Sequence, residues 1–149
     1  CIVSSDRVLC IGGGSVPCTA IEIACLTDAS VVVVDNDPCA VCNAQKLIEE
    51  LHIEEKVKVL LASGEDLELN GFTVIHIAKQ VCPRQRVIQS VWKKASDGAR
   101  ILVRNPKALA RPFYTKWDNE KWLFMTKGHQ PSCDWWSETH LIVKEGKTA

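Results

Sequence analysis

The feature that most constrains this chain is a run of three consecutive glycines, Gly12 to Gly14, between an apolar segment and a helical one. The apolar segment "RVLCI", residues 7–11, is typical of a buried strand. Pro17 suits the first position of a helix, where its missing N–H is not needed, so the pattern predicts a helix over residues 17–26. Glycines between a strand and a helix let the backbone approach a ligand closely. The stretch therefore predicts a strand–loop–helix unit with a ligand at its loop.

Strand-like and helix-like segments alternate as far as Asn105. The segment "SVVVVDND" is β-branched without interruption, which is typical of a strand covered on both faces. Asp37 and Pro38 then suit the cap and the first position of a helix. Such alternation predicts a mostly parallel sheet with helices on both faces. The further predicted strands are 30–37, 56–62, 72–78 and 99–105, and the further predicted helices are 38–53 and 83–96.

The last third of the chain does not continue this alternation of strands and helices. Two late strands, at residues 121–128 and 139–145, enclose a polar, turn-rich loop and predict an antiparallel hairpin. We expect the tryptophans of this region to pack the hairpin and the sheet edge: Trp117, Trp122, Trp135 and Trp136. The predicted fold class is therefore α/β, a Rossmann-like, mostly parallel seven-stranded sheet with helices on both faces and a C-terminal antiparallel hairpin.

Length and charge exclude several classes of protein. The chain has 149 residues, which suits one domain over residues 1–149, and it begins at Cys1 rather than Met, which we take as a truncated N-terminus. With 18 basic and 18 acidic residues, it has no cationic excess for nucleic-acid phosphates, so we expect no nucleic-acid partner. No apolar run approaches the ~20 residues of a membrane helix, and no signal-peptide pattern is present. We expect a cytoplasmic protein without a membrane partner, with a homodimer as one form.

The chain has eight cysteines. They fall mostly inside apolar patterns, and nothing indicates secretion, so we expect free thiols that act as small hydrophobes. Cys39 and Cys42 form a Cys-x-x-Cys pair inside a predicted helix, but no second pair stands at zinc-ribbon spacing, and the four histidines are scattered. We therefore predict no metal site.

The polar loops that follow the strands indicate what the glycine loop binds. In an open α/β sheet the ligand lies outside the carboxyl ends of the strands, which places the glycine loop beside Asp35. A carboxylate there can accept both hydroxyls of a ribose. The dinucleotide fingerprint G-x-G-x-x-G fails because Pro17 stands at its third glycine, and no Gly-Lys-Ser/Thr completes a P-loop. A second acidic loop, "SGED" at residues 63–66, follows the third strand.

This order of motifs resembles the class I S-adenosylmethionine-dependent methyltransferases over nearly the whole chain. In that family the glycine loop lies against the methionine and ribose, the acid that ends the second strand holds the ribose hydroxyls, and the loop after the third strand meets the adenine. This chain departs from the family at Cys10 and Thr73, where many members have acids. The resemblance implies S-adenosylmethionine as cofactor, bound by Gly12, Gly13, Gly14, Ser15, Asp35, Asn36, Gly64, Glu65, Asp66 and Ala78.

A closer resemblance exists within this superfamily. The segment "IGGGSVPCT" is similar to the G-x-G-P-L-P-x-T loop of nicotianamine synthase-like enzymes, with Ser15 where those enzymes have Pro. The segment from Pro83 to Asn105 is similar to their region after the fourth strand, including Arg104 near its end. These enzymes transfer the aminocarboxypropyl arm of S-adenosylmethionine, and their substrate-handling residues lie largely in an N-terminal domain that this chain lacks.

Three functions follow from the resemblance. Our first expectation is methyl transfer to a small-molecule substrate; the alternatives are aminocarboxypropyl transfer and a non-catalytic domain that binds the cofactor. Displacement at a carbon beside a sulfonium requires no acid or base, so no catalytic residue is identified. The sequence "AKQVCP" lacks the Asn/Asp-Pro-Pro-Tyr motif, which argues against adenine-N6 or glutamine methylation. We interpret His76 as a satisfied core histidine, and expect Arg104 to pair either a ligand carboxylate or a surface acid.

Overall fold

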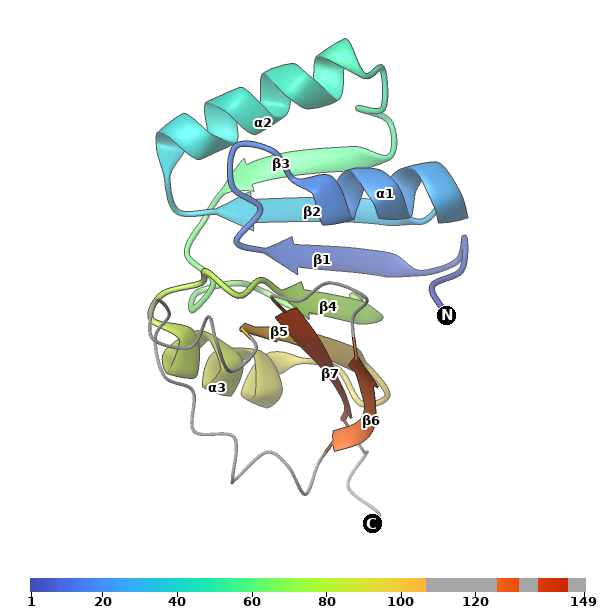
Figure 1. The fold of residues 1–149 in the computed structure, drawn as a ribbon, viewed down its shortest axis with the longest axis vertical. Coiled ribbons are helices and arrows are strands. Elements are labelled where there is room, and N and C mark those ends of the chain that lie inside the picture. Colours follow the sequence, from blue (N-terminus) through green and yellow to red (C-terminus); the bar gives the residue numbers. More distant parts are fainter. Residues whose placement is uncertain (107–125, 132–136, 145–149) are drawn as a thin grey trace.

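The computed structural model describes residues 1–106, 126–131 and 137–144. Figure 1 shows an open twisted sheet with helices packed against it. The helices are α1 (Cys18–Thr27), α2 (Pro38–Glu50) and α3 (Arg84–Lys94). The strands are β1 (Arg7–Ile11), β2 (Ser30–Asp35), β3 (Val57–Leu61), β4 (Val74–Ile77), β5 (Arg100–Pro106), β6 (Thr126–Pro131) and β7 (Ser137–Val143).

The sheet has the order β3-β2-β1-β4-β5-β7-β6. The strands from β3 to β5 pair in parallel, and β7 pairs antiparallel with both β5 and β6. The chain places β2 and β3 on one side of β1 and β4 and β5 on the other, so the strand order switches between β1 and β4. A ligand site is expected at the carboxyl ends of these two strands. The predicted mostly parallel sheet with a C-terminal antiparallel hairpin is confirmed. The hairpin strands β6 (Thr126–Pro131) and β7 (Ser137–Val143) differ in their bounds from the predicted strands 121–128 and 139–145, and residues 121–125 lie outside the described residues.

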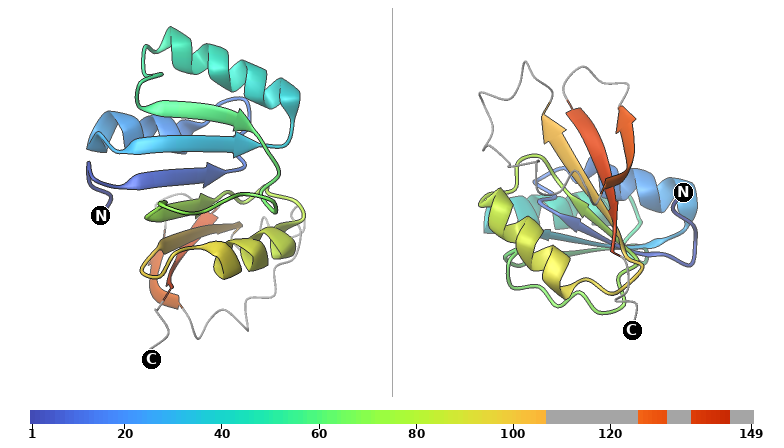
Figure 2. Two further views of the ribbon diagram at one scale, coloured as in Figure 1. Left: turned by 180° about the vertical axis from the view of Figure 1, so that it is seen from behind. Right: turned by 90° about the horizontal axis from the view of Figure 1, so that it is seen from below.

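Helices cover both faces of the sheet, as the right-hand view of Figure 2 shows. α1 and α2 pack on one face with Val31 and Val33, and α3 packs on the other with Val34. This two-sided burial explains the unbroken valine run of β2, because each successive side chain meets a covered face. Among the described residues, no helix is long and apolar enough to span a membrane.

Two predictions need correction. α1 begins at Cys18 rather than at the predicted Pro17, and its buried residues are Ala20 and Ala24. Small alanines let this helix lie close against the sheet, and Ile21 and Ile23 pack beside them, partly buried. The expectation that the thiols act as core hydrophobes is met at Cys10 but is wrong for the exposed thiols, which are those of Cys1, Cys18, Cys25, Cys39, Cys42 and Cys82. Cys133 and the four late tryptophans lie outside the residues whose side chains are described.

A buried carboxylate ties the amino-terminal segment to the amino ends of β4 and β5. Asp6 accepts hydrogen bonds from the Val3 N–H at 2.8 Å and the Thr73 hydroxyl at 2.7 Å, and it forms an ion pair with Arg100 at 2.5 Å. Burial alone would raise the pKa of Asp6. The backbone hydrogen bond, the hydrogen bonds from Arg100 and Thr73, and the charge of Arg100 nevertheless lower it to about 2. The carboxylate therefore stays ionised in the folded protein.

We predict that Asp6→Asn lowers the free energy of unfolding by about 1–2 kcal/mol at neutral pH, because the ion pair with Arg100 is lost. The loss is limited to this size because solvent reaches the partly exposed Arg100 and weakens the pair. The folded pKa is depressed, so the contribution is present above the unfolded pKa of 3.8 and disappears as the pH falls through about 2. The variant should lack this acid-dependent loss, as measured by urea denaturation between pH 2 and 7.

Asp28→Asn is the matched control, because Asp28 pairs with Lys56 at the surface and its side chain is 74% exposed. Screening by water leaves such a pair with little effect on stability. Equal losses in the two variants would contradict the role assigned to Asp6.

Candidate cofactor site

The glycine loop between β1 and α1 is pinned to the end of β2. The backbone N–H groups of Gly12 and Gly13 both donate to the Val34 carbonyl, at 2.9 and 3.2 Å. A Cβ atom on Gly13 would lie 2.2 Å from a methyl of Val33, which real side chains never tolerate. Gly14 differs, because its φ of +64° favours glycine while the space beside it is open. The loop therefore packs tightly at its first two glycines and leaves room for a ligand at the third.

Asp35 ends β2 and faces this open position. Its Oδ2 accepts the Gly14 N–H at 2.8 Å, and its Oδ1 accepts the Asp37 N–H at 3.0 Å. The prediction that Asp37 caps the second helix is confirmed, because its side chain accepts the Cys39 N–H at the start of α2. Each carboxylate oxygen of Asp35 accepts one backbone hydrogen bond and keeps a further lone pair. The carboxylate is thus held in place while it can still bind two hydroxyl groups.

The loop after β3 is attached to α3. The Glu65 carbonyl accepts hydrogen bonds from the Ser90 hydroxyl at 2.6 Å and from Lys94 Nζ at 3.0 Å. Gly64 lies under the loop, where a Cβ atom would come within 2.8 Å of an Ile11 methyl. The loop is therefore positioned by α3 from one side and by the end of β1 from the other.

A buried arginine organises the opposite wall of the site. Arg84, at the start of α3, is 2% exposed. Its Nη1 donates to the Ala78 carbonyl at 2.9 Å, and its Nη2 donates to Asn105 Oδ1 at 2.7 Å and to the Arg104 carbonyl. Burial lowers the pKa of the guanidinium to about 10, so it stays charged. One planar side chain therefore connects the carboxyl ends of β4 and β5 to α3.

These elements enclose two adjoining cavities that share Ile11, Gly12 and Gln80. The larger, about 290 Å³, is lined on its polar side by Gly14, Asp35, Asn36, Ser63, Gly64 and Glu65. Val81, Cys82 and Pro83 form its other wall, which the sequence pattern did not assign to the site. A flat apolar wall opposite a fixed carboxylate has the form of a nucleoside pocket.

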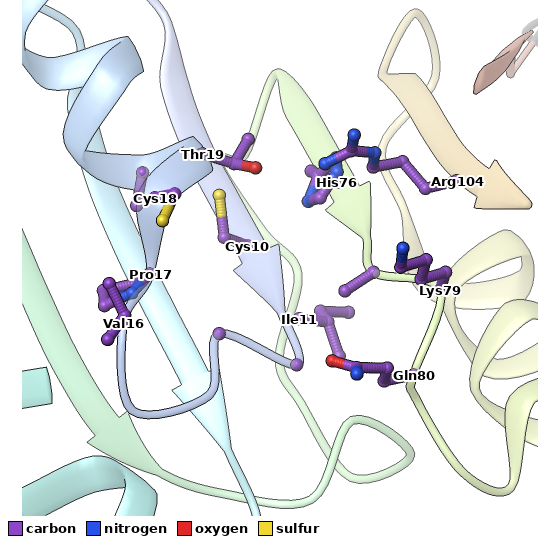
Figure 3. Close-up of a pocket in the computed structure, with 14 residues that line it drawn as sticks. Cys10, Ile11, Val16, Pro17, Cys18, Thr19, His76, Lys79, Gln80 and Arg104 are labelled. Carbon is purple, nitrogen blue, oxygen red and sulfur yellow. The ribbon is translucent and has the colours of Figure 1, made fainter. Parts of the chain in front are cut away.

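The smaller cavity, about 160 Å³, lies between β1, α1 and the segment after β4. Figure 3 shows His76, Lys79 and Arg104 on one side of it and Cys10, Cys18 and Thr19 on the other. His76 is 6% exposed, and its Nε2 atom has no hydrogen-bond partner among the described residues. The interpretation of His76 as a satisfied core histidine is therefore wrong, because its pattern revealed burial but not what its nitrogens meet. Arg104 lines this cavity, and what it pairs with stays a prediction.

The structure brings together most of the predicted cofactor residues. Gly12, Gly13 and Ala78 line the smaller cavity, and Gly12 also lines the larger one. Five further predicted cofactor residues line the larger cavity: Gly14, Asp35, Asn36, Gly64 and Glu65. Ser15 and Asp66 line neither cavity, because the chain carries them past the rim. Within the described residues no group of three or more His, Cys, Asp or Glu side chains could hold a metal ion.

Comparison with solved structures defines the class of fold. A structure of an RNA methyltransferase from Salinibacter ruber, solved with S-adenosyl-L-homocysteine, superposes with a TM-score of 0.78 at 14% identity, over 99% of this chain and 86% of that one. MtNAS, solved in complex with MTA and tNA, superposes with a TM-score of 0.78 at 24% identity, over 95% of this chain and 54% of that one. The chain has the Rossmann-like fold of the class I methyltransferases.

The sequence narrows this class to one family. The sequence model of the nicotianamine synthase protein family matches residues 2–132, so the chain belongs to that family. A curated relative, L-histidine 2-aminobutanoyltransferase of Yersinia pestis, is 26% identical over 144 residues, which cover 95% of this chain and 49% of the relative. The chain thus spans about half the length of that relative.

We predict that Arg84→Met lowers the free energy of unfolding by about 1–3 kcal/mol, because the carbonyls of Ala78 and Arg104 and the Asn105 amide lose a charged donor inside the protein. Relief of the buried charge offsets part of this loss. Hydrogen exchange should also accelerate at the amides of residues 78–82, a segment that lines the smaller cavity at its start and the larger cavity at its end. Chemical denaturation and exchange mass spectrometry measure the two effects.

Arg86→Met, at an exposed position of the same helix, is the matched control and should change neither quantity. An Arg84→Met variant with unaltered exchange at residues 78–82 would show that the guanidinium does not position this segment.

Proposed function

We propose that this protein is an S-adenosylmethionine-dependent transferase that moves the aminocarboxypropyl group of its cofactor to an amine. The observation that carries the proposal is the family match over residues 2–132, which contains every residue of both cavities. Two relatives support the choice of group, since one is an L-histidine 2-aminobutanoyltransferase and MtNAS was solved with MTA. These findings favour the aminocarboxypropyl reaction over methyl transfer, which was the first expectation.

The residues of the larger cavity fit a nucleoside. Asp35 keeps a free lone pair on each oxygen, at the spacing of vicinal ribose hydroxyls, and Gly14 leaves open space where a side chain would stand. Asn36 and Glu65 line the neighbouring wall, where an adenine would find polar groups at its edge. Val81 and Val87 supply the apolar surface that an adenine face requires.

The protein's contribution to the reaction is alignment. When bound, S-adenosylmethionine supplies carbons activated by a sulfonium, and its orientation decides which of them meets the nucleophile. Asp35 and the glycine loop hold the ribose end, while Gln80, which lines both cavities, stands at their junction. The hydrogen bonds of Arg84 to the carbonyls of Ala78 and Arg104 hold the segment after β4 beside the end of β5 and so keep the junction in position.

We propose an amino acid as the acceptor, with L-histidine as the first candidate, because the curated relative is named for that substrate. An amine nucleophile attacks the carbon, the carbon–sulfur bond breaks, and the displaced electron pair stays on sulfur. The amine then loses one proton to solvent. Asp35 and Glu65 are the only carboxylates among the described residues that line the cavities, so we expect the acceptor amine to enter in its neutral form and the ammonium formed by the attack to release its proton to solvent.

The identity of the product tests the proposal. Incubation of the full-length protein with S-adenosylmethionine and L-histidine, or with other amines, should yield methylthioadenosine and an acceptor that carries the aminocarboxypropyl group, as measured by mass spectrometry. S-adenosylhomocysteine as the enzyme-dependent product would establish methyl transfer instead. Tight binding of the cofactor without either product, across the amines tested, would indicate a non-catalytic domain.

We predict that Asp35→Ala weakens the binding of S-adenosylhomocysteine by about ten- to a hundredfold, because a charged acceptor of the ribose hydroxyls is lost. The substitution also releases the Gly14 N–H, so the loop should become more mobile. Asp37→Ala is the matched control, since it removes the α2 cap, about 1 kcal/mol of stability, without touching either cavity. Isothermal titration calorimetry measures both affinities, and equal affinity for wild type and a folded Asp35→Ala protein would remove Asp35 from the site.

A further inference from the structure

The start of α2 carries two cysteines that the proposed function does not use. Cys39 and Cys42 lie three residues apart in this helix, and they line neither cavity. Side chains at this spacing share a face of a helix, with their Cβ atoms about 5–6 Å apart. Both residues are exposed, and both thiols are free. The helix therefore presents two neighbouring thiols to solvent.

The backbone at the start of α2 is connected to the Asp35 carboxylate. The Asp37 N–H donates to Asp35 Oδ1 at 3.0 Å, so the residue that caps the helix also holds the acid. On the helix side, the Asp37 side chain accepts the Cys39 N–H at 2.8 Å, and its carbonyl accepts the Val41 N–H at 3.0 Å. Figure 1 shows α2 beginning beside the end of β2. A displacement of the Cys39 backbone therefore reaches Asp35 through one intervening residue.

A disulfide between the two thiols requires such a displacement. The Cβ atoms of a disulfide lie about 3.5–4.5 Å apart, so those of a helical pair at this spacing must approach each other by roughly 1 Å. The turn that contains the Val41–Asp37 hydrogen bond then has to tighten. The amino end of a helix tolerates this better than its middle, because its first N–H groups have no partner within the helix.

We propose that Cys39 and Cys42 form a reversible disulfide that weakens cofactor binding through Asp35. A disulfide such as oxidised glutathione is the oxidant. One thiolate attacks a glutathione sulfur and releases the first glutathione thiolate, and the other then attacks the mixed disulfide and releases the second. Each released thiolate takes up one of the two protons that the cysteines lose. Formation of the bond is independent of the proposed function, whereas its effect on the cofactor rests on that function.

Mass spectrometry tests whether the bond forms. After treatment of the full-length protein with oxidised glutathione, alkylation and proteolysis should recover one unalkylated peptide that contains both Cys39 and Cys42 and lacks their two thiol hydrogens. Thiols that stay reduced, stable mixed disulfides at both positions, or a bond from either residue to another cysteine would overturn the proposal.

Calorimetry with S-adenosylhomocysteine measures the effect on the site. The disulfide form should bind it about three- to tenfold more weakly than the dithiol form, because Asp35 loses one of the backbone hydrogen bonds that orient it. Reduction with dithiothreitol should restore the affinity. By reciprocity the ligand should favour the dithiol, and in a glutathione buffer it should raise the midpoint potential of the pair by about 30 mV for a tenfold difference in affinity.

Two serine variants separate this pair from the other thiols. Cys39→Ser cannot form the bond, so oxidised glutathione should leave its affinity for S-adenosylhomocysteine unchanged. A loss that persists in this variant would assign the effect to another thiol, such as Cys82 in the wall of the larger cavity, and would overturn the proposal. Cys25→Ser is the matched control, because it removes an exposed thiol of α1 that lines neither cavity, and it should respond to oxidation as wild type does.

Failure of the coupling and failure of the proposed function give different results. If the reduced protein binds S-adenosylhomocysteine and the disulfide forms without a change in affinity, the coupling to Asp35 is overturned while the proposed function stands. If the reduced protein binds neither S-adenosylhomocysteine nor S-adenosylmethionine, the proposed function fails and the coupling fails with it.

Discussion

The attachment of the glycine loop to the end of β2 is the interaction on which the rest of the site depends. Gly12 and Gly13 share the Val34 carbonyl, and Asp35 accepts the N–H of Gly14. These contacts hold the loop down on the sheet and orient the Asp35 carboxylate at the same time. Because the loop is also the start of α1, its position determines where both cavities open. A site built in this way is present before any ligand arrives, and binding then requires little ordering of the chain.

The second support comes from Arg84, on the other side of the switch point. A buried guanidinium is costly, and the pKa of Arg84 is lowered accordingly. The chain tolerates it because the planar donor reaches the carbonyls of Ala78 and Arg104, which end neighbouring strands. The same charge contributes to the field that keeps His76 neutral. Structural support and the electrostatics of the smaller cavity therefore depend on one side chain.

Family membership and site geometry bear on different questions. The match over residues 2–132 shows the family, from which the reaction is proposed, while the solved structures of low identity establish the fold alone. Geometry adds the division of the site into a larger cavity, which Asp35 and Glu65 line, and a smaller cavity, which His76, Lys79 and Arg104 line. This chain spans about half the length of its curated relative.

The sequence by itself determined the alternation of strands and helices, the mostly parallel sheet, the glycine loop, and Asp35 at the end of the second strand, because periodicity, strand-end acids and glycines are local signals. The order of the strands within the sheet came from the tertiary structure. It also carried the family resemblance. Tertiary structure alone decided that Ser15 and Asp66 lie outside the cavities, that Val81 to Pro83 form a wall, and that most thiols are exposed. It also decided that His76 Nε2 has no hydrogen-bond partner within the part of the chain that the structure describes, and that Arg84 joins two strand ends. Burial is predictable from a pattern of apolar residues, but hydrogen-bond partners depend on atoms brought together from distant parts of the chain, which no local pattern records.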